Sequence, residues 1–139
     1  SDTMEVDITP APTADAGSDQ TVCANNSDVG LNGSVTVANG GVWSTTGGGT
    51  FADDTSLSTT YFPDSTDTAN GSVDLILTTT GNGDCNPVSD TMTVTITDAP
   101  VVDAGDSPIY TCLGDTSTQL DGSSSTSSGV WNTSGSGTF

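Results

Sequence analysis

The chain has 139 residues and 18 acidic side chains, with no Lys, Arg or His, so its formal net charge is −18. Salt bridges between side chains are therefore excluded. Nucleic acid and anionic membranes are disfavoured as partners, because their binding depends on Lys and Arg. No apolar run approaches the roughly 20 residues that span a bilayer, so we expect no direct membrane insertion, with any export signal or anchor outside these residues.

The opening of the chain is repeated 88 residues later. The segment "TMEVDITPAP" at 3–12 corresponds to "TMTVTITDAP" at 91–100, and "GGVWSTTGGGTF" at 40–51 corresponds to "SGVWNTSGSGTF" at 128–139. Between these matches the offset changes briefly to 89, which two one-residue indels in loops explain. Self-similarity at a fixed period is typical of tandem structural units.

This period divides the chain into three parts. We expect residues 1–10 to be the last strand of a preceding repeat, residues 11–98 a complete repeat, and residues 99–139 the first half of the following one. A chain that begins and ends inside a domain would leave unpaired sheet edges, which favour aggregation. We therefore expect a longer parent chain.

Within the complete repeat, short segments flanked by Gly, Asn, Asp and Pro clusters predict strands at 13–16, 20–23, 28–35, 41–45 and 57–62. The segment "GSVDLILTTTG" at 71–81 alternates apolar and polar residues, with Ile76 as the exception. In "TMTVTIT" at 91–97, Met92, Val94 and Ile96 alternate with Thr, which indicates one buried and one exposed face. No stretch shows helical spacing.

About seven short strands with one Trp, Trp43, in the middle of the repeat predict an all-β fold. The expected architecture is a series of tandem immunoglobulin-like antiparallel β-sandwich repeats of about 88 residues. A unit of this size can fold alone.

The three cysteines follow the repeat. Cys112 corresponds to Cys23, and its own partner would lie near position 173, so we expect Cys23 and Cys85 to form a disulfide within the complete repeat. A bond closing such a loop contributes roughly 4 kcal/mol in the chain-entropy model, and it implies an oxidising, extracytoplasmic location. The alternative is two reduced, unrelated thiols.

Several segments resemble a known family. "ADAGSDQTVC", "GVWSTTGGGTF" and "DTMTVTITDAPVVDAG" are similar to the PKD-like, immunoglobulin-like tandem repeats of very large Bacteroidetes cell-surface proteins, which include gliding-motility adhesins. The resemblance covers essentially the whole chain. It implies a surface-exposed stalk or adhesin, exported by the type IX secretion route.

We expect no catalytic activity. Ser and Thr are abundant, but without His or Lys no usual general base can activate them. Asp53 and Asp54 are neighbouring carboxylates, yet adjacent residues point apart and nothing apolar nearby would raise a pKa.

Calcium is the sharper hypothesis, because seventeen of the 18 acids are Asp in loops rich in Gly, Asn and Thr, and Ca²⁺ takes oxygen ligands. Asp15 and Asp103 each follow a repeat boundary, and Asp98 could join Asp103 in a site that stiffens the junction. The secondary candidates are Asp53, Asp54, Asp64 and Asp67. The alternative is a solvated acidic surface that keeps a long fibre soluble and self-repelling.

Four residues stand in tripeptides that resemble the Bacteroidetes O-glycosylation pattern of Asp, then Ser or Thr, then an aliphatic, Met or Thr residue. They are Thr3, Ser65, Thr68 and Thr91. Thr3 and Thr91 occupy the same position of the repeat, on the strand face predicted to meet solvent.

The expected function is that of a non-catalytic structural and adhesive segment of an extracellular cell-surface protein. Its partners would be neighbouring repeats of the same chain, and surface glycans or other surface proteins. One alternative is a carbohydrate-binding module of a secreted enzyme, which needs an exposed aromatic platform, whereas Trp43 and Trp131 share one repeat position and favour a core role. Another is a self-assembling fibre subunit that exchanges strands between chains.

Overall fold

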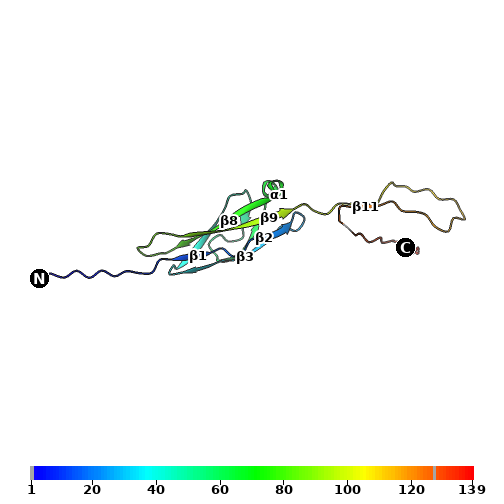
Figure 1. Cartoon of the computed structure of the whole chain (residues 1–139). Helices are drawn as coiled ribbons and strands as arrows, with labels where there is room; N and C mark the ends of the chain where they lie inside the picture. Colours follow the sequence, from blue (N-terminus) through cyan, green and yellow to red (C-terminus); the bar gives the residue numbers. More distant parts are fainter. Residues whose placement is uncertain (1, 127) are drawn as a thin grey trace. The chain divides into compact units, whose positions relative to one another are not determined.

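The computed structural model describes residues 2–126 and 128–139, which form two compact units, one ending at Asp98 and one beginning at Ala99. No helix among the described residues is long and apolar enough to cross a membrane. The first unit contains nearly all of the regular structure, and several of its strands are labelled in Figure 1.

The first unit is built from β-sheets. The larger sheet has the order β2 (Gln20–Cys23), β9 (Ser89–Thr97), β8 (Ser72–Thr80) and β5 (Gly40–Thr45). A second sheet has the order β3 (Val29–Asn32), β7 (Ser58–Phe62) and β6 (Thr50–Phe51), and β1 (Thr13–Asp15) pairs with β4 (Ser34–Thr36). All pairs are antiparallel except β2 with β9, which run parallel. The predicted antiparallel pairing is therefore confirmed for the other pairs of this unit, whereas β2 with β9 departs from the prediction.

One hydrophobic core joins the two main sheets. Val29 and Leu31 on β3 and Tyr61 on β7 pack in the same cluster as residues of β5, β8 and β9, namely Trp43, Val73, Leu75, Leu77, Met92, Val94 and Ile96. The period-two prediction for β8 and β9 is confirmed, because alternate residues are buried from Val73 to Thr79 in β8 and from Met92 to Ile96 in β9. Trp43 is only 2% exposed, so its predicted core role is also confirmed.

The single strand predicted at 28–35 is two strands, β3 and β4, separated at Gly33. The chain changes partners there, because β3 pairs with β7 whereas β4 pairs with β1. A Cβ on Gly33 would lie 2.6 Å from a Leu77 methyl carbon and 2.8 Å from the Trp43 ring. Only glycine lets the backbone cross this close to the core.

Although no stretch of the sequence shows helical spacing, one short segment forms a helix, α1 (Ser65–Asn70). Asp64 is its N-cap, and Asp67 completes a capping box. Gly71 ends the helix in the left-handed conformation, with φ of 73°. Six residues are too few to show a helical period, so only the capping residues could have indicated it.

Residues 2–10, predicted as the last strand of a preceding repeat, form no strand in this structure. The equivalent residues at 90–98 lie mostly in β9, where β2 and β8 hydrogen-bond them from both sides. No strand of the first unit pairs with residues 2–10, which explains the difference.

The second unit reproduces the start of the first. Its strands β10 (Val102–Asp103) and β11 (Ser123–Ser124) pair Val102 with Ser124, as β1 and β4 pair the equivalent Ala14 with Val35. The turn that follows is also the same. The backbone N–H of Gly17 donates to Asp15 at 2.9 Å, and that of Gly105 donates to Asp103 at 2.8 Å. The repeated sequence thus has a repeated local structure.

The alternation along β9 gives a direct test of its register. Replacing the buried Val94 by Asp should lower the free energy of unfolding by about 4 kcal/mol or more, because it places an unpaired charge in the core. Replacing the neighbouring exposed Thr95 by Asp should change it by no more than about 0.5 kcal/mol. Denaturant unfolding of the two variants makes the comparison, and equal effects would contradict the register.

Candidate functional site

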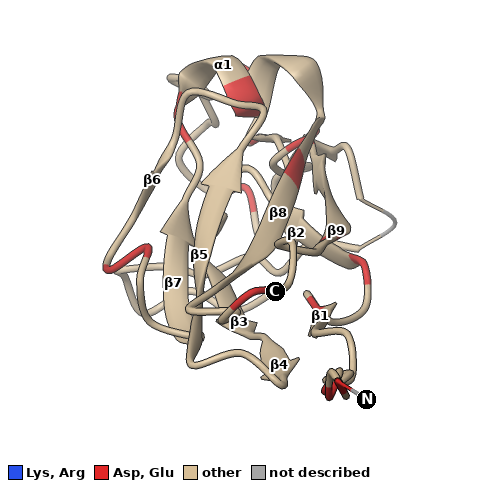
Figure 2. Ribbon diagram, turned by 90° about the vertical axis from the view of Figure 1, so that its left-hand side faces the viewer, with Lys and Arg blue, Asp and Glu red and all other residues tan. Residues whose placement is uncertain are grey.

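Several hydrogen bonds of the first unit converge on the carboxylate of Asp67. This polar site lies at the end of the domain that carries α1 (Figure 2). Asp67 is only 1% exposed. The Tyr61 hydroxyl donates to its Oδ2 at 2.6 Å. The backbone N–H groups of Gly48, Gly49 and Asp64 donate to its two oxygens at 3.1, 3.2 and 3.3 Å. Four donors from three segments of the chain therefore converge on one side chain.

The glycine run at 47–49 lets the chain approach this carboxylate. A Cβ on Gly47 would collide with the Asp67 side chain, and a Cβ on Gly48 would collide with the Asp64 carboxylate. On Gly49 it would meet the Phe62 carbonyl oxygen and the Tyr61 hydroxyl. The loop before β6 thus lies against the first turn of α1 because it has no side chains there.

The hydrogen bonds at this site shift two pKa values in opposite directions. Burial acts to raise the pKa of Asp67, but the bonds donated by Tyr61, Gly48, Asp64 and Gly49 outweigh it, so this pKa lies below its usual value. Burial, together with the hydrogen bond to Asp67, raises the pKa of Tyr61 to about 12. Asp67 is therefore ionised and Tyr61 protonated at neutral pH.

This geometry assigns a structural role to Asp67. Its oxygens accept four bonds from the protein, and Asp64 accepts bonds from the backbone of Thr66 and Asp67 as a helix cap. N–H and O–H donors occupy the lone pairs that a cation would need. The calcium role predicted for Asp64 and Asp67 stays a prediction without support from these contacts.

The other predicted calcium ligands are dispersed. Asp15 and Asp103 each accept a bond within their own turn. Asp53 accepts bonds from the side chain and backbone of Thr55, which lower its pKa. Asp54 and Asp98 are exposed.

No three acidic or cysteine side chains gather in a metal-binding group among residues 2–126 and 128–139. Asp98 belongs to the first unit and Asp103 to the second, and their joint site stays a prediction.

The predicted disulfide between Cys23 and Cys85 is corrected by the structure, in which both cysteines are free. Cys23 ends β2 and pairs with Thr97 at the end of β9, whereas Cys85 lies in the loop that precedes β9. The end of β2 and the start of β9 lie at opposite ends of the first unit in Figure 1. At about 3.3 Å per residue, the length of β9 separates them by roughly 26 Å, far beyond the Cα separation of about 4.4–6.8 Å in a disulfide.

The four residues predicted as O-glycosylation sites differ in accessibility. Thr3, Ser65 and Thr91 are exposed. Thr68 is half-buried, and its hydroxyl donates to the Asp64 carbonyl oxygen at 2.9 Å within α1. The first three are therefore the more accessible candidates.

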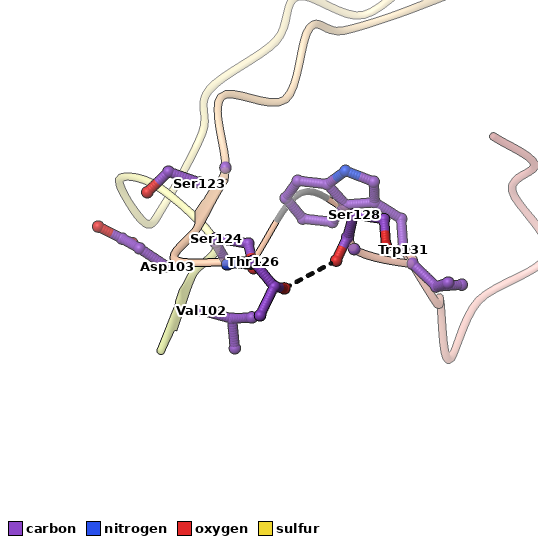
Figure 3. Close-up of a pocket in the computed structure, with 11 residues that line it drawn as sticks. Val102, Asp103, Ser123, Ser124, Thr126, Ser128 and Trp131 are labelled. Atoms are coloured by element: carbon purple, nitrogen blue, oxygen red, sulfur yellow. Dashed lines mark hydrogen bonds between the residues drawn. The ribbon is translucent and has the colours of Figure 1, made fainter. Parts of the chain in front are cut away.

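The second unit contains a pocket of about 330 Å³ beside Trp131 (Figure 3). A Cβ on Gly122 would lie 2.6 Å from the Trp131 ring, as a Cβ on the equivalent Gly33 would lie 2.8 Å from the Trp43 ring. In the first unit a Cβ on Gly33 would also lie 2.6 Å from a Leu77 methyl carbon. Trp131 is 40% exposed, whereas Trp43 is 2% exposed. We interpret the pocket as an uncovered part of the repeat core, with no ligand required to explain it.

Sequence reasoning missed the roles of Tyr61 and of Gly47, Gly48 and Gly49. The available signal was the pair of aspartates three residues apart after Pro63, which has the spacing of a capping box. No protein-family model matches the chain, and no curated protein matches it.

The carboxylate site predicts a specific loss of stability. Asp67→Asn should lower the free energy of unfolding by about 3 kcal/mol at neutral pH, because the amide turns a donor towards groups that are themselves donors. Asp54→Asn removes the same charge from an exposed loop residue and should have almost no effect. Denaturant unfolding compares the two variants, and similar losses would contradict the structural role of Asp67.

The same site predicts a pH dependence. The pKa of Asp67 is lowered on folding, so its stabilisation is complete above the unfolded value of about 3.9 and is lost as the pH falls through the folded pKa. The difference in unfolding free energy between the native chain and Asp67→Asn should therefore shrink below about pH 4. A constant difference across an acid titration would show that ionisation of Asp67 is not involved.

Proposed function

We propose that this chain is a segment of a non-catalytic stalk, built from tandem immunoglobulin-like repeats, in a large secreted cell-surface adhesin. The observation that carries the proposal is the recurrence of one structural pattern. The β1–β4 and β10–β11 pairs, together with their Asp-Ala-Gly turns, occupy equivalent positions of the repeated sequence. Repetition of a small β domain along a chain produces length, which is what a stalk requires.

The strand order supports an immunoglobulin-like topology. In a constant-type domain, strands B, E and D lie in one sheet and strands C, F and G in the other. Here β3, β7 and β6 form one sheet, and β5, β8 and β9 lie in the other in the corresponding order. The buried Trp43 on β5 matches the buried tryptophan on strand C.

Composition supports an exposed, extracellular location. A chain without Lys or Arg has no cleavage site for trypsin-like proteases. Its negative charge keeps neighbouring fibres apart and soluble. Adhesive contacts with surface glycans or other surface proteins would use the loops. The burial of Trp43 counts against a sugar-binding module, because this tryptophan cannot serve as an aromatic platform.

Labelling of intact source cells tests the location. Antibodies raised against the 139-residue chain should bind intact cells as strongly as permeabilised ones, and protease that cleaves after aromatic residues should remove the signal from intact cells. The matched control is a set of permeabilised cells treated with the same protease, in which an intracellular protein shows whether the protease has entered. Labelling that requires permeabilisation would overturn the proposal.

A second test concerns the role of the acidic residues. It distinguishes a solvated acidic surface from a calcium site at Asp98 and Asp103. A solvated surface predicts that the melting temperature rises with NaCl, because screening weakens the repulsion among acids. Millimolar calcium should then add no further rise over excess chelator at the same ionic strength. A specific rise with calcium would contradict this account and support bound calcium, since a ligand of the folded state stabilises it.

A further inference from the structure

Each cysteine of the complete repeat lies against a residue at one end of that repeat. The sulfur of Cys23 is 3.5 Å from the carbonyl oxygen of Asp98, where the chain leaves the repeat. The sulfur of Cys85 is 3.8 Å from the carbonyl oxygen of Pro10, where the chain enters it, and 3.5 Å from the Thr9 hydroxyl. The two thiols therefore lie at opposite ends of one domain, each beside a junction.

Pro10 and Asp98 are the same position of the repeat, because "DITPAP" at 7–12 corresponds to "TITDAP" at 95–100. Where two complete repeats follow one another, Cys23 of the first and the Cys85 equivalent of the second would both lie against this one carbonyl oxygen. Their sulfurs could then be no further apart than the sum of the two distances, about 7 Å. Side-chain rotation can close a gap of this size to the roughly 2 Å of a disulfide.

We propose that Cys23 of each repeat forms a disulfide with the Cys85 equivalent of the repeat that follows, so that successive domains are covalently linked across each junction. The two thiols lose two protons and two electrons as one S–S bond forms. A small-molecule disulfide such as oxidised glutathione accepts them and becomes two thiols. The proposal rests on the tandem organisation in the proposed function, but not on where the protein is located.

With this linkage, each of the three cysteines has a partner in a neighbouring repeat. Cys85 would pair with the repeat that precedes it, Cys23 with the repeat that follows, and Cys112, the equivalent of Cys23, with the repeat after its own. The half-buried state of Cys23 and Cys85 also fits, because each sulfur already lies against junction residues rather than in open solvent.

The linkage would limit how far a loaded array extends. Between one bond at Cys85 and the next at Cys112 lie 27 residues of backbone, which reach about 90 Å when fully stretched. Under load, the force would pass along this stretch of backbone and through the disulfide at each of its ends. It would therefore bypass most of the residues of two repeats. Unfolded domains would therefore stay short under load.

The test uses a chain in which residues 1–98 are followed by residues 11–139, so that the complete repeat occurs twice and five cysteines are present. The chain is refolded in a glutathione redox buffer, unfolded in alkylating reagent and weighed by mass spectrometry. One disulfide and three alkylated thiols are expected. Two disulfides would indicate pairing within each repeat, and five alkylated thiols would indicate no bond; either result would overturn the proposal.

Four single variants of this chain locate the bond, because the copies are otherwise identical. Cys23→Ser in the first copy and Cys85→Ser in the second should each abolish the disulfide. Cys85→Ser in the first copy and Cys23→Ser in the second should leave it intact. Retention of the bond in either of the first two variants would contradict the assignment.

Unfolding of all variants in reductant provides the folding control, and equal midpoints show that the serines did not disturb the domains. The outcome is separate from that of the proposed function. Cell labelling decides the location, and cysteine mapping decides how the repeats are joined.

Discussion

The first unit depends on β9, which lies between β8 and β2 and is hydrogen-bonded along both edges. Its inward side chains, Met92, Val94 and Ile96, fill the core that both sheets share. The chain also enters the domain against this strand, since the backbone N–H of Ala16 donates to Asp90 at 2.7 Å. A single long strand therefore holds the entry and the exit of the domain at its two ends.

A second constraint is the absence of any cationic side chain. A buried carboxylate is costly unless it is paired or hydrogen-bonded, and here only N–H and O–H groups can satisfy it. Asp67 has four such donors, and Thr93 donates its hydroxyl to Asp74 and its backbone N–H to Asp19, both at 2.8 Å. The short Asp side chain reaches nearby backbone N–H groups in turns and caps, as Asp15, Asp53 and Asp64 do here.

The sequence alone predicted much of this fold. Alternation located the two longest strands and their buried faces, because a period of two is unambiguous over nine residues. It could not show that β2 runs parallel to β9, since a strand of four residues carries no information about its neighbour. It also missed α1 and the break at Gly33, where tertiary contacts with Leu77 and Trp43 decide the local path.

The site was predicted less well than the fold. Asp64 and Asp67 were predicted only as secondary calcium ligands, and the partners Gly48 and Tyr61 reach Asp67 only in the folded domain. The cysteines show the same limitation. Position in the repeat suggested that Cys23 and Cys85 belong together, whereas the length of β9 places them at opposite ends.

The proposed stalk consists of β domains that are joined at their ends and carry load, and stretching the chain with two complete repeats tests this proposal most directly. In reductant, each unfolding domain should extend the chain by up to about 300 Å, the reach of 88 residues. Under oxidising conditions these two steps should disappear. The disulfide joins Cys23 of the first copy to Cys85 of the second, so the residues between these two cysteines, which make up most of both domains, cannot be stretched. Two full-length steps would show that no bond is present. Two steps of roughly 90 Å would show that each domain is closed by its own cysteines, and either result would contradict the account.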